Sequence, residues 1–294
     1  MTDNIMQMKS VASAQSSDRS IGAILIDSGK LSIEDTEQIL RLQEIENLRF
    51  GDAAISLGLL TQTDIQYALA SQYDFPYLLK DDAAVSESLV AAYIPYCHQV
   101  ETLRTLRSQL MLRRFTGQPK RKMLSIISPS RGEGRSYLAA NLAIVFSQLG
   151  ERTLLIDADM RHPCQHQLFK LDNRYGFSSL LAGRGGEGQA VQRVNNFVDL
   201  SVLTAGPVPP NPQELLGRPV LTNLLSSLNE DFDVILVDTS AAADFADAHI
   251  VTARTGAAVV LARKNHSRLE LVSSQTESLS RSGVEVIGTV LSEF

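Results

Sequence analysis

The C-terminal two-thirds of the chain alternates short apolar runs with longer amphipathic stretches. The apolar runs lie near 123–128, 153–157, 198–204, 233–238, 257–262 and 284–291. Runs of this length, with helical patterns between several of them, predict parallel strands joined by crossover helices. We therefore expect an α/β domain over 101–294, in which a parallel sheet is flanked by helices.

Residues 20–80 follow a different pattern, in which similar residues recur at one constant spacing. The matched pairs are Gly22 and Gly51, Gly29 and Gly58, Leu31 and Leu60, Leu40 and Leu69, and Gln43 and Gln72. A series of matches at one offset indicates a tandem repeat, and each unit is predicted as a helix, a glycine stop and a second helix. The expected core consists of Ile24, Leu25, Leu31, Ile39, Leu40, Ile55, Leu57, Leu60, Ile65 and Leu69.

The segments outside these two domains lack a clear period. Residues 1–19 are rich in Ser, Gln and Asp without a signal-peptide apolar region, so we expect a disordered tail. Residues 81–100 are predicted to be a linker. A helix is expected after it, followed by a solvated basic cluster made of Arg113, Arg114, Lys120, Arg121 and Lys122.

A glycine loop follows the apolar run at 123–127. The sequence Ser128-Pro-Ser-Arg-Gly-Glu-Gly-Arg-Ser136 half-matches the phosphate-loop pattern G-x-x-x-x-G-K-[ST]. Gly134 and Ser136 fit, whereas Pro129 replaces the first glycine and Arg135 the lysine. Backbone N–H groups of such a loop, and of the helix that follows it, bind phosphate. We therefore expect residues 132–136 to hold the β-phosphate of a nucleotide.

Acidic residues end two of the predicted strands. Asp157 and Asp159 follow the run at 153–156, and Asp238 ends the run near 233–238. One such acid commonly caps a helix or faces solvent. Several acids on two parallel strands share a rim with the glycine loop, which favours a nucleotide site. The expected roles are Mg²⁺ coordination by Ser136, an outer shell formed by Asp159 and Asp238, and neutralisation of β- and γ-phosphate oxygens by Arg135.

Composition excludes several other classes of protein. A net charge of −6 argues against a protein that coats nucleic acid. Cys97 and Cys164 form no CxxC motif, which favours a reduced cytoplasmic setting. No apolar run approaches the ~18 residues needed to cross a bilayer. His162, Cys164 and His166 supply only three alternating ligands, so no zinc site is expected.

Residues 100–294 resemble the bacterial tyrosine kinases that control capsule and exopolysaccharide export, which are P-loop proteins. In combination with the repeat domain, they resemble the subgroup of chain-length-determinant tyrosine kinases of exopolysaccharide gene clusters. The resemblance rests on four motifs: E-x-x-R-x-x-R at Glu101, Arg104 and Arg107, Gly-Glu-Gly-Arg-Ser in the loop, Leu-Leu-Ile-Asp-Ala-Asp-Met-Arg at 154–161, and Val-Ile-Leu-Val-Asp-Thr at 234–239. It implies a protein tyrosine kinase that uses ATP and Mg²⁺, with Asp157 as the base. The implied catalytic residues are Asp157, Asp159 and Arg135; the nucleotide contacts are Gly132, Glu133, Gly134, Arg135, Ser136 and Tyr137; and the metal site is Ser136, Asp159 and Asp238.

The same resemblance implies partners and a location. Glu101, Arg104 and Arg107 are expected to mediate self-association. A separate inner-membrane chain-length determinant is the expected partner, which places the chain in the cytoplasm at the membrane periphery, and nucleic acid is not an expected partner. Arg135 departs from the family's lysine, and the last tyrosine is Tyr175, so the family's C-terminal tyrosine cluster has no counterpart here. Two alternatives stay open: a non-catalytic nucleotide switch that assembles a membrane complex, and a positioning ATPase of the related P-loop group.

The repeat at 20–80 resembles the N-terminal domain of type II secretion and pilus-extension ATPases, in its cyclic di-GMP-binding form. The residues that carry this resemblance are Gly22, Gly29, Gln43, Arg49, Gly51, Gly58 and Gln72. Ser20 stands where the first copy of the motif has an arginine. Cyclic di-GMP binding and a role as a docking module are both compatible with this sequence.

Overall fold

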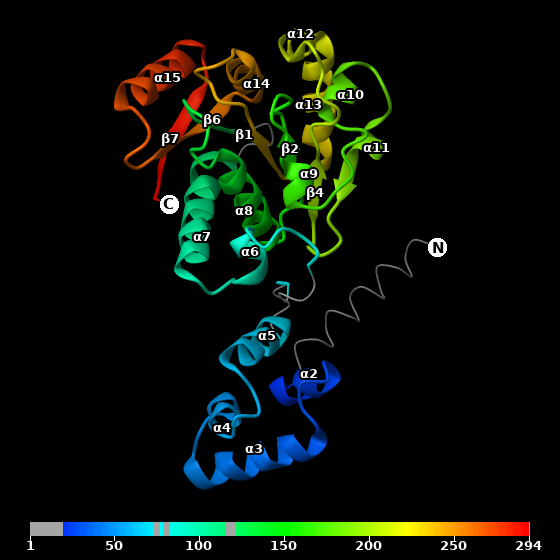
Figure 1. The fold of residues 1–294 in the computed structure, drawn as a ribbon, viewed down its shortest axis with the longest axis vertical. Coiled ribbons are helices and arrows are strands. Elements are labelled where there is room, and N and C mark those ends of the chain that lie inside the picture. Colours follow the sequence, from blue (N-terminus) through cyan, green and yellow to red (C-terminus); the bar gives the residue numbers. More distant parts are fainter. Residues whose placement is uncertain (1–19, 73–76, 79–82, 116–121, 294) are drawn as a thin grey trace. The chain divides into compact units, whose positions relative to one another are not determined.

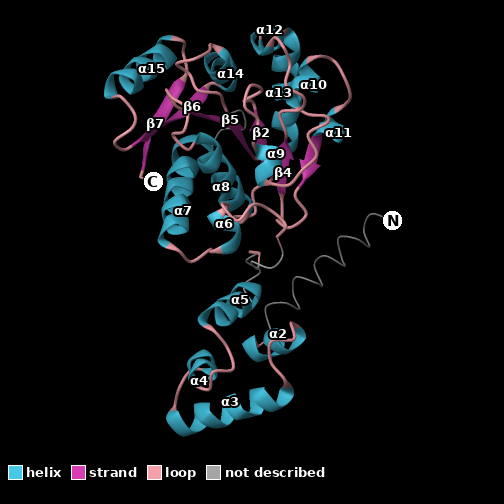
Figure 2. Ribbon diagram, in the orientation of Figure 1, coloured by secondary structure: helices cyan, strands magenta, loops and turns pink. Residues whose placement is uncertain are grey.

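The computed structural model describes residues 20–72, 77–78, 83–115 and 122–293, so the predicted tail at 1–19 lies outside the described residues. The chain divides into two compact units, Met1–Tyr77 and Leu78–Phe294. In the described residues, the first unit contains helices, and the strands lie in the second (Figures 1 and 2). None of the described helices is both long and apolar enough to cross a lipid bilayer.

The N-terminal unit has the predicted repeat of helix, glycine stop and helix. Its helices are α2 (Ile21–Asp27), α3 (Ile33–Glu46), α4 (Phe50–Ser56) and α5 (Gln62–Gln72). Gly29 and Gly58 adopt left-handed φ angles of +70° and +69° just after α2 and α4, a conformation that glycine reaches without strain. The two stops are therefore equivalent in conformation as well as in sequence.

The second helix of each repeat begins with the predicted cap. Ser32 and Asp35 form a capping box, in which each side chain accepts the other residue's backbone N–H at 3.0 Å. Thr61 and Asp64 make the same reciprocal pair at the start of α5. These local hydrogen bonds satisfy N–H groups that the first helical turn leaves free.

The core of this unit confirms only part of the predicted set. Leu25, Leu31, Ile39, Leu60 and Ile65 are buried, and Ala53, Ala54 and Ala68 join them. Leu40, Ile55 and Leu57 were expected inside, but they are 48%, 37% and 39% exposed. Leu40 follows Ile39 directly, and one step along a helix turns a side chain by about 100°, away from the buried face.

The C-terminal unit is built on a seven-stranded sheet of order β3-β4-β2-β5-β1-β6-β7. The strands are β1 (Met123–Ile127), β2 (Thr153–Asp157), β3 (Val191–Arg193), β4 (Leu200–Leu203), β5 (Val234–Asp238), β6 (Ala257–Arg263) and β7 (Glu285–Ser292). All pairings are parallel except that between β3 and β4. The predicted α/β class and its six parallel strands are confirmed, and β3 is an additional edge strand.

Helices cover both faces of the sheet (Figure 1). They are α6 (Val90–Tyr93), α7 (His98–Leu110), the π-helix η2 (Met111–Phe115), α8 (Arg135–Ser147), α9 (Gln165–Leu168), α10 (Phe177–Leu181), α11 (Glu187–Ala190), α12 (Pro212–Leu216), α13 (Pro219–Asp231), α14 (Asp247–Thr255) and α15 (Leu269–Arg281). One apolar core joins α7 and α8 to the sheet. On the other face, α10, α12 and α13 share a second core, and α14 and α15 a third.

The described part of the predicted linker, 83–100, belongs to the sheet domain instead. Val85, Leu89 and Val100 are wholly or almost wholly buried in the core beneath α8. The Tyr93 hydroxyl donates to the Val85 carbonyl at 2.8 Å, and the Ala91 N–H donates to the Asn141 side chain at 3.0 Å. The segment packs because its apolar side chains fill the sheet domain, although they follow no helical or strand period.

The predicted basic cluster is not uniformly solvated. Arg114 is only 6% exposed, and its guanidinium donates to the carbonyls of Met123 and Thr255 at 3.2 and 3.3 Å. It also pairs with Glu285 at 3.1 Å. A guanidinium can be buried in this way because its planar array of donors finds several fixed acceptors at once. Arg114 therefore ties η2 to the sheet.

Candidate nucleotide-binding and catalytic site

The predicted phosphate loop lies between β1 and α8. Gly132 and Gly134 adopt φ angles of +76° and +95°, which only glycine reaches easily. Gly134 is the N-cap of α8, so the loop leads directly into a 13-residue helix. The backbone N–H groups of the first turn of a helix carry partial positive charge and suit a phosphate group.

Glu133 braces this loop from inside. Its side chain is fully buried, accepts the Ser130 N–H at 2.7 Å and accepts the Ser267 hydroxyl. The Glu133 carbonyl accepts the Ser292 hydroxyl at 3.2 Å. Hydrogen bonds from the segment after β6 and from the end of β7 thus fix the loop. The Glu133 side chain therefore supports the loop's shape, and the nucleotide contact expected of this residue is through its backbone N–H group.

Arg135 occupies the position of the usual phosphate-loop lysine, and its guanidinium turns toward the protein. Nε donates to the Thr239 carbonyl at 2.9 Å, and Nη1 donates to the Ser130 carbonyl at 2.7 Å and to the Ser128 hydroxyl. The residue is 7% exposed. In this conformation Arg135 holds the loop against the segment after β5, and it differs from the prediction that Arg135 faces phosphate oxygens.

Asp157 and Asp238 end neighbouring parallel strands in direct register. Asp157 is fully buried, and its carboxylate accepts the backbone N–H groups of Asp159, Cys164 and Gln165 at 3.2, 3.1 and 3.0 Å. Burial, with the charge of Asp238 as a second cause, raises the pKa of Asp157 well above its usual value. A carboxylate with a raised pKa suits proton transfer near neutral pH.

Asp238 is also fully buried, and its pKa is raised to about 6 by burial. Hydrogen bonding from Ser136 and Gln165 opposes this rise, and the Gln165 amide donates to Oδ2 at 2.8 Å. The other oxygen, Oδ1, has no hydrogen-bond partner among the described residues. A buried carboxylate oxygen without a partner is uncommon and is a suitable acceptor for a metal-bound water.

The oxygen-rich surroundings of Asp238 fit Mg²⁺. Ser136 lies in the first turn of α8 beside Asp238, and Asp159 lies two residues beyond the end of β2. Oδ1 of Asp159 accepts the N–H groups of Arg161 and His162 at 3.2 and 2.9 Å. No three His, Cys, Asp or Glu side chains within the described ranges converge as a protein-only metal site. Mg²⁺ commonly keeps several waters, so a hydroxyl and water-bridged carboxylates suffice.

A mostly apolar groove of about 960 Å³ opens beside the phosphate loop. Gly132, Gly134 and Tyr137 form its wall on the loop side. Leu103 of α7 and Leu291 of β7 are among the side chains on its other walls. Clefts of this size and lining accommodate cofactor-sized ligands. Tyr137, predicted as a nucleotide contact, therefore lies where the base or ribose of a nucleotide could bind.

The residues of the E-x-x-R-x-x-R motif make contacts within this chain. Glu101 pairs with Arg104 one turn along α7. Arg107 Nη1 donates to the Val145 carbonyl near the end of α8 at 2.7 Å. Arg107 thus joins α7 to α8, while the Glu101 side chain is 57% exposed.

In the N-terminal unit, packing and turn geometry account for the repeated glycines. A Cβ on Gly22 would lie 3.5 Å from the Phe50 ring, and a Cβ on Gly51 would lie 3.1 Å from Ile65. Arg49 is exposed immediately before α4, and Gln43 and Gln72 are half-buried on α3 and α5. The arrangement explains the repeat as a helical scaffold and leaves Arg49 accessible.

Several residues of the candidate site were not predicted from the sequence. Gln165 donates to Asp238 and also to the Ser136 carbonyl at 3.1 Å, so it links the ends of β5 and α8. Ser267 and Thr239 hold Glu133 and Arg135 in place. Thr239 directly follows the acid of β5, a position that pointed toward the site, whereas Gln165 and Ser267 lie in unremarkable loop sequence.

Comparison with known proteins shows the family to which this chain belongs. No protein-family model matches the chain. The tyrosine-protein kinase YwqD of Bacillus subtilis is 33% identical over 207 residues, which cover 70% of this chain and 86% of that protein. The putative tyrosine-protein kinase EpsB of Ralstonia solanacearum is 34% identical over 78% of this chain, but the match spans only 29% of its length. The solved kinase domain of the Escherichia coli tyrosine kinase ETK is 31% identical, with a TM-score of 0.66, over 70% of this chain and 79% of that domain.

YwqD is matched over most of its length, whereas the match to EpsB covers less than a third of that protein. The chain belongs to the family of bacterial tyrosine-protein kinases.

Proposed function

We propose that this protein is an ATP- and Mg²⁺-dependent protein tyrosine kinase that modifies itself and regulates exopolysaccharide polymerisation and export. One observation carries the chemical part of the proposal. The buried pair Asp157 and Asp238 lies at the carboxyl rim of the sheet, beside Ser136 and the phosphate loop. This arrangement brings together a phosphate cradle, a place for Mg²⁺ and a carboxylate with a raised pKa.

Each residue has a defined role in the proposed reaction. The loop and the start of α8 bind the phosphates, and Ser136 with water-bridged Asp159 and Asp238 would hold Mg²⁺. Asp157 accepts the proton of the tyrosine hydroxyl as the phosphoryl group is transferred. Arg135 approaches the β- and γ-phosphates by exchanging its loop contacts for phosphate oxygens. Phosphoryl transfer rests mainly on such positioning and charge neutralisation.

Phosphorylation of tyrosine distinguishes the proposed kinase from the two alternative functions. A nucleotide-dependent assembly switch would bind ATP without phosphorylating tyrosine. A positioning ATPase would hydrolyse ATP and would have no use for a tyrosine acceptor. The kinase proposal is favoured because this chain belongs to the tyrosine-kinase family, with 33% identity to YwqD over 70% of this chain.

A transfer assay tests the function. The full chain is incubated with Mg²⁺-ATP and a synthetic glutamate–tyrosine polymer, and phosphotyrosine is measured on both the polymer and the chain. We expect transfer by the wild type and none by Asp157→Asn or Asp238→Asn, with unchanged circular dichroism. ATP hydrolysis without any phosphotyrosine would refute the kinase and favour a positioning ATPase.

We also propose that the chain works with an inner-membrane polysaccharide chain-length determinant and associates with itself, so that it lies at the cytoplasmic side of that membrane. The support is family membership together with the exposed Glu101 side chain of α7. Co-purification with the chain-length determinant of the same gene cluster tests the partner. Recovery of the wild-type chain only in fractions without that protein would contradict it.

For the N-terminal unit we propose binding of cyclic di-GMP, with docking as the alternative role. Arg49 is accessible before α4 and can stack on a guanine or pair with its edge. Calorimetry on the full chain tests this, and Arg49→Ala should weaken binding by on the order of 1–3 kcal/mol. Arg41→Ala, which removes an exposed side chain of α3, is the control. Equal heats for wild type and Arg49→Ala would leave the unit as a docking module.

A further inference from the structure

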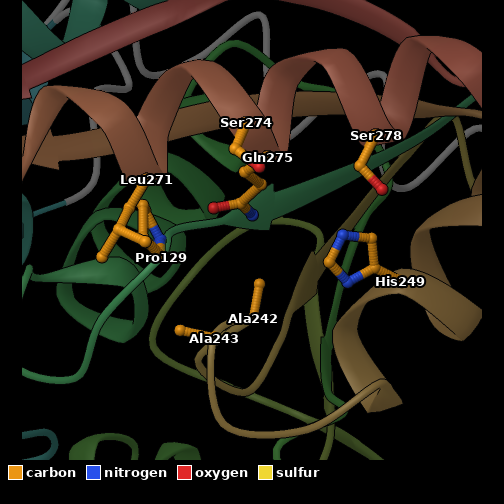
Figure 3. A pocket seen from close by; sticks show the side chains of 8 residues that line it. All are labelled: Pro129, Ala242, Ala243, His249, Leu271, Ser274, Gln275 and Ser278. Atoms are coloured by element: carbon orange, nitrogen blue, oxygen red, sulfur yellow. The ribbon is translucent and has the colours of Figure 1, made fainter.

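A small cavity lies apart from the nucleotide groove, on the face of the sheet covered by α14 and α15. Its volume is about 180 Å³. Pro129 of the phosphate loop, Ala242 and Ala243 after β5, and Leu271 of α15 form apolar walls (Figure 3). Gln275 of α15 extends toward Ala242, and His249 of α14 lies toward the other end (Figure 3).

Gln275 is an anomaly in the core. It shares the buried face of α15 with Val272 and Leu279, at a spacing where an apolar residue is expected. The residue is 6% exposed, yet neither its amide nitrogen nor its amide oxygen has a hydrogen-bond partner within the described residues. Burying such a group without partners is destabilising, so a leucine would be more stable here. Neither amide atom is exposed to solvent, although the side chain borders the cavity, so a ligand that draws the amide into the cavity would supply the missing partners.

The side chain of Gln275 defines the chemistry of that ligand. A carboxamide presents one N–H donor beside one carbonyl acceptor in a plane. Its complement is a flat group with an acceptor beside a donor, as when glutamine binds the edge of a base through two hydrogen bonds. An amide or a lactam edge provides this pattern.

The volume of the cavity and the charge of its lining residues further limit the class of ligand. A cavity of about 150 Å³ is large enough to hold one benzene ring, so this cavity accommodates a single six-membered ring. None of the lining residues carries a fixed charge, and burial lowers the pKa of His249, which keeps its imidazole neutral at neutral pH. An uncharged ring fits these surroundings, whereas a nucleotide phosphate would lack a counter-charge.

We propose that this cavity is a binding site for an uncharged, single-ring molecule with an amide or lactam edge, of the pyrimidine-base or aromatic-carboxamide class. The ring lies between the apolar walls, and Gln275 pairs with its edge. The site is separate from the proposed nucleotide groove, and the proposal does not depend on kinase activity.

The cavity has a direct structural connection to the phosphate loop. Ala242 donates its N–H to the Ser128 carbonyl at 3.0 Å, and Ala243 donates to the Pro129 carbonyl at 2.9 Å. A ring that fixes these wall residues therefore also fixes the start of the loop. Because such coupling is reciprocal, binding of the ring and binding of ADP should change each other's affinity by the same factor.

The test uses the full chain saturated with ADP and Mg²⁺, so that the nucleotide groove is filled. Uracil and nicotinamide are titrated by ligand-observed NMR, with benzene and pyridine as rings of similar size without the amide. We expect saturable binding of at least one amide probe, at least about tenfold tighter than either plain ring. No binding by either amide probe, or equal binding by the plain rings, would overturn the proposal.

Variants at Gln275 complete the test. Gln275→Leu and the similarly shaped Gln275→Met should each weaken amide-probe binding at least about tenfold and raise the melting temperature of the ligand-free chain. Ser273→Ala, on the same helix at an exposed position outside the cavity lining, should leave both unchanged. Probe binding that survives in a folded Gln275→Met or Gln275→Leu chain would refute the assignment.

Discussion

Asp157 and Asp238 are direct neighbours across β2 and β5, and both carboxyl groups are completely buried. Two acids in this position repel each other when charged, and burial adds to the penalty. Asp157 is compensated by three backbone N–H groups, whereas one oxygen of Asp238 is left without a partner among the described residues. The pair is therefore destabilising in the metal-free protein, as expected of a functional site.

This penalty predicts a pH-dependent gain in stability for Asp238→Asn in the presence of EDTA. The folded-state pKa of Asp238, about 6, lies above the ordinary value of 3.8, so the folded chain binds the proton more tightly than the unfolded chain. The stabilisation from protonation is present below about pH 4 and is lost as pH rises through about 6. Above that pH, the variant should be more stable than wild type by on the order of 1–3 kcal/mol. Urea unfolding at several pH values measures this, and a pH-independent difference would contradict it.

Ser136→Ala should uncouple nucleotide binding from Mg²⁺. The hydroxyl lies at the start of α8 beside Asp238, where it would be a direct metal ligand. We expect ADP affinity without Mg²⁺ to stay near the wild-type value, while its enhancement by Mg²⁺ falls at least about tenfold. Calorimetry with and without the metal measures both. Ser147→Ala, at the other end of the same helix, is the buried-serine control, and an unchanged metal response in Ser136→Ala would rule out the role.

Arg104→Ala and Arg107→Ala together should give a smaller assembly than wild type, as measured by size exclusion with light scattering. The single variants separate assembly from folding, because Arg107 also joins α7 to the Val145 carbonyl. Arg107→Ala should lower the melting temperature. Arg104→Ala removes a side chain that is 17% exposed and paired with the more exposed Glu101, so it should change the mass with a smaller loss of stability. Equal masses for all four chains, with and without nucleotide, would exclude this helix from the interface.

Sequence patterns located the parallel strands and the glycine loop because both depend on local features, namely continuous apolar runs and residues that favour turns. They missed β3, which has three residues and pairs antiparallel at the sheet edge. They also placed Arg114 in solvent and 83–100 in a linker, because burial of those residues depends on partners far away in the sequence, such as Thr255, Glu285 and Asn141. For the same reason the inward orientation of Arg135 and the role of Gln165 were not predictable.

Gly176→Ala should destabilise the sheet domain. A Cβ at this position would lie 2.3 Å from both the Gly206 nitrogen and the Thr204 carbonyl oxygen, so two backbone segments would have to separate. We expect a loss of about 1–3 kcal/mol in the free energy of unfolding, measured in urea. Gly188→Ala lies in α11 with no atom within 4 Å of the added methyl group, and it should be neutral or slightly stabilising. Similar effects of the two substitutions would show that the backbone approach is looser than described.

The Arg135 guanidinium already donates hydrogen bonds to the protein, so it would have to exchange them for hydrogen bonds to phosphate when a nucleotide binds. The guanidinium already has acceptors in Thr239, Ser130 and Ser128 before any nucleotide arrives. Each contact it makes to a phosphate then replaces a contact to the protein, so only the difference between the two contributes to affinity. These carbonyls belong to the loop and to the segment after β5, so in the proposed reaction a γ-phosphate that binds Arg135 would release both segments from the guanidinium.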